Sequence, residues 1–483
     1  MKTAIEPGPE LRKRGLPSNG LTQPDPVAQA NQKLTWMPPV ISAVIWGSGQ
    51  VANRQPLKGT VFFVFFISMI AVELLTGRYP AGQAGFSFRD NGGFFLKGLW
   101  GLVTLGTTPR KMGLSGLSEG DHSIVLMVNG IIAVFVLLIF ACIWIWGLRD
   151  AAAVAKLRAT GVNSEPSVSY YRKLWQKSYA YLVLTPSTIL VLFVSVLPIV
   201  FGIAIAFTTY DRNHLPPAQL VQWVGFENFG RLVSVASWAQ TFFGVFLWTV
   251  VWAVLATLTT YLFGFIQATI LASKRVKFPK LWRSIYILPW AVPAMISALV
   301  FRAMFNGQFG PISGFLVDIG LTDERINWFT DPNNPNLARI VALLLNLWLG
   351  FPYFMALIAG TLTNIDKNYY EAARLDGATA VQQFRSITFP IVYRATAPLL
   401  ILAFVSNFNN FGVIYFLTGG GPANPDYQYA GNTDLLITWL YKLTLDNRLY
   451  NIGAVMSIVI FIVVGAFSVW NLRRSRALED GDV

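Results

Sequence analysis

The sequence is poor in the residues that most often carry chemistry. Among its 483 residues there is one cysteine, Cys142, and there are two histidines, His122 and His214. A lone cysteine within an apolar run excludes a disulfide framework and a cysteine-based metal site. We expect both histidines to lie at the surface of external loops rather than in a metal site or a catalytic triad.

The chain also has few charged residues. They make up 13% of the sequence, against roughly 25% in soluble domains, whereas 54% of the residues are hydrophobic. This balance predicts an integral membrane protein. The start of the chain is polar and rich in Pro and Gly, without an early apolar core, which argues against a cleavable signal peptide.

A phosphate-binding loop is missing as well. The Gly-rich turn at 419–422 is not followed by the Lys-Ser/Thr pair that a Walker-type loop requires. We therefore expect that this chain does not hydrolyse ATP, is not an enzyme by itself, and holds no metal or cofactor of its own.

The sequence does have long apolar runs. About eight of them reach the ~20 residues needed to cross a bilayer. They lie at 60–77, 123–148, 180–209, 239–272, 284–305, 339–362, 396–418 and 453–472. The pattern predicts an all-α polytopic membrane protein with about eight transmembrane helices. A shorter apolar stretch at 94–105 predicts an interfacial or re-entrant segment.

The net charge of +13 follows the expected membrane topology. Basic residues are concentrated at 149–178, at 273–283 and in the tail after 472. The positive-inside rule therefore places both termini in the cytoplasm, with the basic loop 78–122 as the one discordant external segment. We attribute the net charge to this topology rather than to nucleic-acid binding.

The same topology divides the chain into four parts. They are a cytoplasmic N-terminal segment at 1–59, two spans with their external loop at 60–178, a core of spans three to eight at 179–475 and a cytoplasmic tail at 476–483.

A polar segment at 363–395 separates the sixth span from the seventh, on the cytoplasmic side. Asp366 and Thr379 can cap two short helices, and Gly377 supplies the positive φ that ends the first. We expect Pro390 to end the second. The pattern predicts a rigid elbow, although an ordinary helical connector between spans has the same spacing.

The residues of this elbow resemble the EAA loop of ABC importer permeases, including its internal spacing. The matching positions are Glu371, Ala372, Ala373, Asp376, Gly377, Ala378, Phe384, Ile387 and Pro390. In that family the loop inserts into a cleft of the ATP-binding subunit, so the resemblance implies that 366–388 is a coupling helix. The residues that would make this ATPase contact are Glu371, Ala372, Ala373, Asp376, Gly377 and Phe384.

Further segments resemble the larger membrane subunit of maltose/maltodextrin ABC importers, of the Gram-positive type. They lie at 287–293, 347–352, 407–411, 417–422 and 430–436. The resemblance implies a type I ABC importer permease fold, a place in the bacterial cell membrane and inward transport of maltose or maltodextrin by alternating access. It also implies the partners: a second homologous permease, two ATP-binding cassette subunits that bind ATP and Mg²⁺, and an extracellular sugar-binding protein.

Polar and aromatic side chains inside the apolar runs are candidates for substrate binding. Asn407 and Asn410 are amides in the seventh span, and Trp290 and Trp348 lie near prolines in the fifth and sixth. Amides suit sugar hydroxyls and indole rings stack on sugar rings. Interhelical hydrogen bonds and ordinary packing explain the same residues, and at this point both interpretations remain open.

The family resemblance names a sugar-contacting set. Its positions match Trp290, Trp348, Leu349, Gly350, Ser406, Asn407 and Asn410. Ser406 departs from the family, which usually has an aromatic residue there. Some Gram-negative members of the family insert a folded domain between the third and fourth spans, whereas the loop here is only 210–238. Contact with the binding protein would therefore come from 78–122, 306–338 and 419–452.

Three alternatives accompany this hypothesis. An ABC permease for another oligosaccharide fits the same motifs. An ion-coupled secondary sugar transporter needs carboxylates within its spans, and a membrane-embedded enzyme needs clustered Asp, Glu or His; the sequence has neither pattern.

Overall fold

A computed structural model describes most of the chain. The described residues are 26–79, 87–110, 112–113, 116–117, 120–159, 167–273 and 275–479. Residues 1–25 of the expected N-terminal segment and 480–483 of the expected tail lie outside this part. The described residues are mostly helical, and their only strands are the antiparallel pair β1 (Met112–Gly113) and β2 (Gly116–Leu117). The predicted all-α fold class is confirmed.

The membrane-spanning helices agree closely with the apolar runs. Seven helices are long and apolar enough to cross a membrane, and a bent pair brings the number to as many as eight in the described chain. They are Pro56–Thr76, Ser123–Ala159, Val183–Ile205, Ala236–Ala272, Pro335–Thr363, Ala380–Leu417, Tyr450–Val469 and the pair Pro279–Ala291 with Ala294–Met304. The 94–105 stretch forms α4 (Phe94–Thr104), which is too short to span.

The chain divides into two compact units. One comprises residues 1–103 and 126–197, and the other 104–125 and 198–483. The boundary expected at 178, ahead of the third span, divides the chain by membrane topology rather than by compactness, and it stays a prediction.

The first unit contains the first two membrane-spanning helices and the helices next to them along the chain. They are α1 (Pro26–Val44), α2 (Ser48–Ala52), α3 (Pro56–Thr76), most of α4, most of α5 (Ser123–Ala159), α6 (Ser167–Val191) and the π-helical turn Leu192–Val196. Lys58 of α3 is only 2% exposed and pairs with Asp150 of α5 at 3.1 Å. The Gln50 amide donates to the carbonyl of Gly147 at 2.7 Å. These bonds fix α2 and α3 against one end of α5.

The second unit contains the remaining helices. They are α7 (Leu197–Ile205), α8 (Glu227–Ser234), α9 (Ala236–Ala272), α10 (Pro279–Ala291), α11 (Ala294–Met304), α12 (Pro311–Asp318), α13 (Pro335–Thr363), α14 (Lys367–Leu375), α15 (Ala380–Gln383), α16 (Phe389–Phe408), α17 (Phe411–Leu417), α18 (Leu436–Tyr441) and α19 (Tyr450–Glu479).

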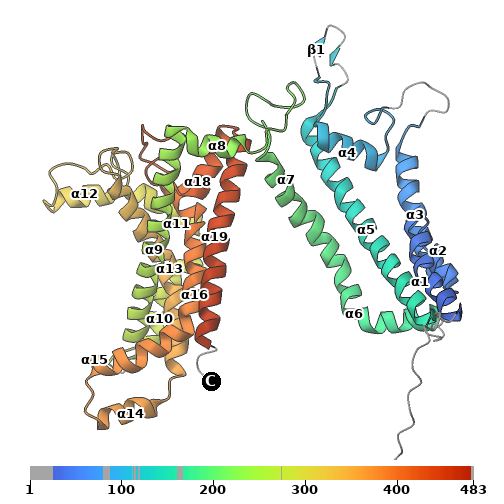
Figure 1. The fold of residues 1–483 in the computed structure, drawn as a ribbon. Helices are drawn as coiled ribbons and strands as arrows, with labels where there is room; N and C mark the ends of the chain where they lie inside the picture. The colour runs from blue at the N-terminus through green and yellow to red at the C-terminus, as the bar shows by residue number, and fades with distance from the viewer. Residues whose placement is uncertain are drawn as a thin grey trace, which may run out of the picture. The chain divides into compact units, whose positions relative to one another are not determined.

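The long helices α9 and α13 form the centre of the second unit. Trp252 of α9 packs with Leu345 of α13 and Ile414 of α17 in one buried cluster. A Cβ added to Gly350 of α13 would stand 2.7 Å from the Thr260 methyl of α9, so this glycine permits a close approach of the two helices. Within this unit, α14 and α15 project at one end and α12 extends at the other (Figure 1).

The expectation about Pro390 is wrong. Pro390 does not end a helix, because the chain stays helical from α15 through the π-helical turn Phe384–Thr388 into α16. A wider π turn accommodates a proline that lacks an N–H and whose ring crowds the preceding turn. The same arrangement, Leu192–Val196, precedes Pro198. Pro352 likewise lies within an unbroken α13.

The breaks in the spans fall elsewhere. The fifth span bends by 91° between α10 and α11, at Val292 and Pro293. The seventh is interrupted between α16 and α17, where Asn409 ends one helix and Asn410 begins the next. Both interruptions lie beside residues that the sequence proposed for substrate binding.

Candidate functional site

The elbow (residues 366–388) is built by local capping. The Asp366 carboxylate accepts the Asn368 N–H at 2.9 Å and starts α14. Gly377 follows with a φ of 77°, a backbone conformation that residues other than glycine rarely adopt. Thr379 then starts α15 through a capping box, in which its N–H donates to Gln382 Oε1 at 2.8 Å. The predicted caps and the glycine turn are confirmed.

One contact within the elbow and one to the rest of the unit hold it in place. The hydroxyls of Tyr370 and Thr388 are 2.9 Å apart, which joins α14 to the π-helical turn. The Phe384 ring lies edge-on to Phe265 of α9 at 5.5 Å. The elbow is therefore in direct contact with a central helix.

The outer surface of the elbow is open and carries exposed apolar side chains among polar and charged ones. Leu375 is 90% exposed, and Val381 and Tyr369 are exposed as well. A shallow cleft of about 300 Å³ lies between the two short helices, with Ala373, Asp376 and Gly377 in its lining. Of the other predicted contact residues, Glu371 and Ala372 are exposed, whereas Phe384 is the anchor to α9.

The amides of the seventh span bond to neighbouring helices. Asn407 donates from Nδ2 to Thr257 Oγ1 of α9 at 3.0 Å. Asn410 donates from Nδ2 to Asn346 Oδ1 of α13 at 3.0 Å and accepts the Val413 N–H at 3.3 Å. Interhelical hydrogen bonds, one of the two interpretations that the sequence allowed, are therefore present. Each amide also keeps donors and acceptors that these bonds do not use.

An aromatic pair joins α10 to α13. The rings of Trp290, at the end of α10, and Tyr353 of α13 are 6.3 Å apart, and both are largely exposed, at 50% and 39%. Tyr353 follows Asn346 by two helical turns on one face of α13, or about 10 Å along its axis. Sequence reasoning missed Tyr353, although it directly follows the 347–352 motif.

The remaining predicted residues lie apart from this face or pack within the unit. Trp348 follows Asn346 by about 200° around α13, and its ring packs on Phe301 of α11 at 5.7 Å. Leu349 packs against the buried cluster, and Gly350 permits the approach to α9. Ser406 is exposed. The structure thus brings Trp290, Asn407 and Asn410 to α13 and its neighbours, and directs Trp348 elsewhere.

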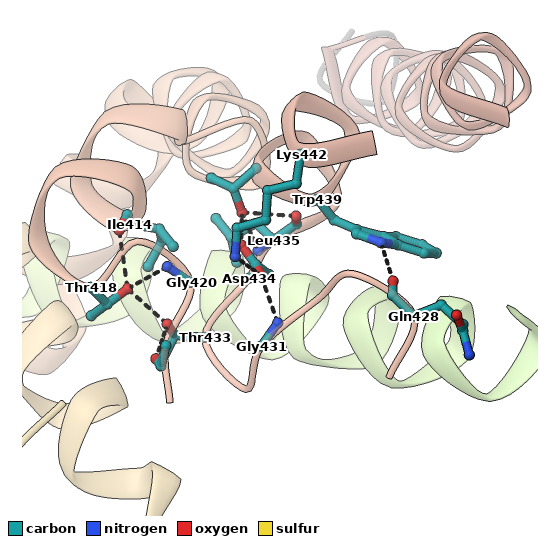
Figure 2. A network of polar contacts seen from close by, with 12 residues as sticks. Ile414, Thr418, Gly420, Gln428, Gly431, Thr433, Asp434, Leu435, Trp439 and Lys442 are labelled. Atoms are coloured by element: carbon teal, nitrogen blue, oxygen red, sulfur yellow. Dashed lines mark hydrogen bonds and ion pairs between the residues drawn. The ribbon is translucent and has the colours of Figure 1, made fainter. Parts of the chain in front are cut away.

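A Gly-rich loop (residues 418–435) closes the opposite end of the unit around one buried carboxylate. Figure 2 shows Asp434 between Gly431, whose N–H donates at 2.7 Å, and Lys442, whose ammonium is 2.6 Å away. The carboxylate is 0% exposed, and Thr438 also donates to it at 2.9 Å. A Cβ on Gly420 would collide with Asp434, so this position requires glycine.

Burial raises the pKa of the Asp434 carboxyl above its ordinary value, against the opposing effect of the Lys442 ammonium. Three hydrogen-bonding partners nevertheless surround the carboxylate, and we take the ion pair as the form that holds the loop. Within the described residues, no group of three or more His, Cys, Asp or Glu could hold a metal ion.

Comparison with known proteins shows a family and several relatives that this chain resembles. A family model described as "Binding-protein-dependent transport system inner membrane component" matches residues 260–477. The galactooligosaccharides transport system permease protein GanP of Bacillus subtilis is 36% identical, with 91% of this chain and 98% of the relative covered. The maltodextrin transport system permease protein MdxF of the same organism is 33% identical, with 91% and 96% covered.

A solved structure supports the fold. A bacterial alginate ABC transporter, in complex with an alginate pentasaccharide-bound periplasmic protein, matches with a TM-score of 0.51 at 21% identity, over 64% of this chain and 97% of the other.

The fold and the elbow are those of a membrane-spanning permease of an ABC importer. The chain belongs to the family of binding-protein-dependent transport system inner membrane components, and it is a multi-pass membrane protein. The resemblance drawn from the sequence motifs is confirmed.

Proposed function

We propose that this chain is the permease subunit of an ATP-driven importer that moves maltose or maltodextrin inward by alternating access. The observation that carries the proposal is the elbow: a capped, exposed surface with apolar side chains among charged ones, in contact with α9 through Phe384, within the region that matches the family. Such a surface suits docking of a second protein whose movement must reach the membrane helices.

The proposed assembly has four further members. A second homologous permease completes the pathway, two ATP-binding cassette subunits dock on the elbows and bind ATP and Mg²⁺, and an extracellular sugar-binding protein delivers the substrate. This chain itself hydrolyses no ATP. Both of its termini lie in the cytoplasm of a bacterial cell, since the basic loops 149–178 and 273–283 favour that side.

The substrate site in this proposal lies where the broken spans meet α13. Asn407 and Asn410 bind sugar hydroxyls, and Trp290 with Tyr353 offers exposed ring faces for stacking. Ser406, exposed beside Asn407, adds a hydroxyl in place of an aromatic ring. Trp348, Leu349 and Gly350 support this site through their packing within the unit.

A galactooligosaccharide is the second candidate substrate. The relative at 36% identity is named for galactooligosaccharides and the one at 33% for maltodextrin. The two classes share hydroxyl-rich pyranose rings, so the same amides and aromatic rings serve either one.

Uptake by the reconstituted complex tests the substrate. Proteoliposomes containing the full complex and its binding protein receive labelled maltotriose or a labelled galactooligosaccharide, with and without internal ATP. We expect ATP-dependent accumulation of maltotriose. Accumulation of the galactooligosaccharide alone would replace maltodextrin by the second candidate, and uptake without ATP would contradict the importer mechanism.

The elbow is tested by Gly377→Pro and Glu371→Arg. Both should reduce co-purification of the ATPase subunits and lower sugar uptake per ATP hydrolysed by about tenfold or more, the effect of losing ~1.4 kcal/mol of coupling. Gly225→Pro is the matched control, because Gly225 also has a positive φ, of 58°, and open space around it, but lies just before α8, outside the elbow and the proposed binding-protein contacts. Unchanged coupling in both elbow variants would disprove the docking role.

A further inference from the structure

The interruption between α16 and α17 breaks the regular helical hydrogen bonding inside a membrane span, where shorter-range bonds remain, such as that from the Asn410 N–H to the Asn407 carbonyl at 3.1 Å. Asn409 ends α16 and Asn410 begins α17, with φ values of −103° and −77°. Helix ends leave backbone groups without intrahelical partners, and in a membrane these groups must find partners within the protein. The break therefore depends on what neighbouring helices supply.

Helix α9 supplies two bonds, both to Asn407. The Trp252 indole N–H donates to the Asn407 backbone carbonyl at 3.0 Å. Thr257 Oγ1 accepts from the Asn407 side chain at 3.0 Å. Trp252 is completely buried and Thr257 nearly so. One residue thus fixes the backbone of Asn407, and the other fixes the orientation of its amide.

Helix α13 supplies the bond to the second amide. Asn346 Oδ1 accepts from Asn410 Nδ2, while Asn410 Oδ1 accepts the Val413 N–H. With these bonds made, Asn407 keeps its Oδ1 acceptor and its second N–H donor, and Asn410 keeps its second N–H donor and one lone pair on Oδ1. Each amide therefore retains both an acceptor and a donor, which matches sugar hydroxyls.

Asn409 shows what happens without such partners. It has the same side chain and lies between the two amides in sequence, but its Nδ2 turns back to the carbonyl of Val405 on its own helix, at 3.3 Å. An amide without an acceptor on a neighbouring helix therefore bonds locally, as Asn side chains commonly do.

We propose that Thr257, Trp252 and Asn346 are positioning residues, which orient Asn407 and Asn410 for the sugar without touching it. The inference rests on the proposed function, because it takes the two amides as sugar ligands. Loss of the Thr257 hydroxyl frees the Asn407 amide to rotate or to bond to its own helix, and the Oδ1 acceptor is then no longer held in place.

The test uses the full complex with its partner permease, ATPases and binding protein in nanodiscs. Labelled maltotriose, or a labelled galactooligosaccharide if uptake selects it, is titrated and its retention is measured after trapping with ATP and vanadate. Thr257→Val should weaken retention about five- to tenfold, the size expected for one lost hydrogen bond. Thr257→Ser, which keeps the hydroxyl, should restore it.

Thr259→Val is the matched control. The Thr259 hydroxyl donates to the Leu255 carbonyl of its own helix, so the same substitution removes no bond to α16. ATP hydrolysis stimulated by the binding protein is the second measurement, and should stay within about twofold in all three variants, because a bond of this size affects the sugar and not the docking of the ATPases.

Three results would overturn the positioning role. They are wild-type retention by Thr257→Val, failure of Thr257→Ser to restore retention, and an equal loss in Thr259→Val. Asn407→Ala separates the two levels of the argument. If it loses the sugar while Thr257→Val keeps it, the sugar site stands and the positioning role is wrong; if Asn407→Ala keeps the sugar, the proposed site itself is wrong.

Discussion

The elbow and the Gly-rich loop are opposite solutions to the same problem, a stable turn between helices. The elbow is held by bonds between residues close in sequence, such as Asp366 to Asn368 and Thr379 to Gln382, and its apolar side chains face outward. The Gly-rich loop is held by the buried carboxylate of Asp434 and by distant helices. The first leaves a surface free for a partner, whereas the second serves the unit's own stability.

The Gly-rich loop is also tied to the centre of the unit. The Trp248 indole of α9 donates to the Thr433 carbonyl at 3.2 Å, and the Arg339 guanidinium of α13 lies over the Trp248 ring at 4.2 Å. The N–H groups of the Arg339 guanidinium donate to the Asn432 carbonyl. Substitutions in this loop should therefore lower stability, while those on the elbow should lower transport.

The largest effect is expected at Asp434. Asp434→Ala leaves Lys442 facing a buried cavity without its counter-charge, and should lower the free energy of unfolding by about 3–5 kcal/mol. Thermal unfolding of the detergent-purified chain measures this. Asp426→Ala in the same loop, at an exposed residue, should change it by less than about 0.5 kcal/mol. Equal effects of the two substitutions would remove the contrast with the elbow.

The helix contact between α9 and α13 should give the next largest effect. Gly350→Ala inserts a methyl group 2.7 Å from the Thr260 side chain, and overpacking of this kind costs about 1–3 kcal/mol. Gly360→Ala, on the same helix with no atom within 4 Å of the added Cβ, is the control. It should be neutral or slightly stabilising, and a loss of stability there instead would argue against close packing as the cause.

Leu375→Asp should separate function from stability. The side chain is 90% exposed, so the unfolding temperature should hardly change, whereas ATP-driven uptake should fall about tenfold, the equivalent of ~1.4 kcal/mol of docking. Leu375→Met keeps the apolar surface and should keep uptake. A fall in stability without a fall in uptake would reverse the assignment of the elbow.

The smallest effect is expected at the cap of α15. Thr379→Ala removes one side of the capping box and should cost about 1 kcal/mol locally. Hydrogen exchange of the α15 amides is the measurement, and faster exchange should stay confined to the elbow because its bonds are local. Faster exchange in α9 as well would mean that the elbow and the core unfold together.

Local chemistry explains why much of this protein was predictable. The spans follow from apolar runs of bilayer length, and the elbow follows from caps and a glycine that act over a few residues. The misplaced features are those that depend on surroundings. Pro390 ends no helix because a π turn precedes it, and the fifth and seventh spans break at Pro293 and Asn409, which the sequence did not mark as helix ends.

The sequence by itself determined the membrane class, the spans, the elbow and the family, because hydropathy, capping and motif spacing are properties of neighbouring residues. Only the tertiary structure decided which side chains meet. Asn407 reaches Thr257, Asn410 reaches Asn346, and Tyr353 joins Trp290, while Trp348 turns to Phe301. These pairs join residues on different helices, and packing between helices, not spacing along the chain, sets those distances.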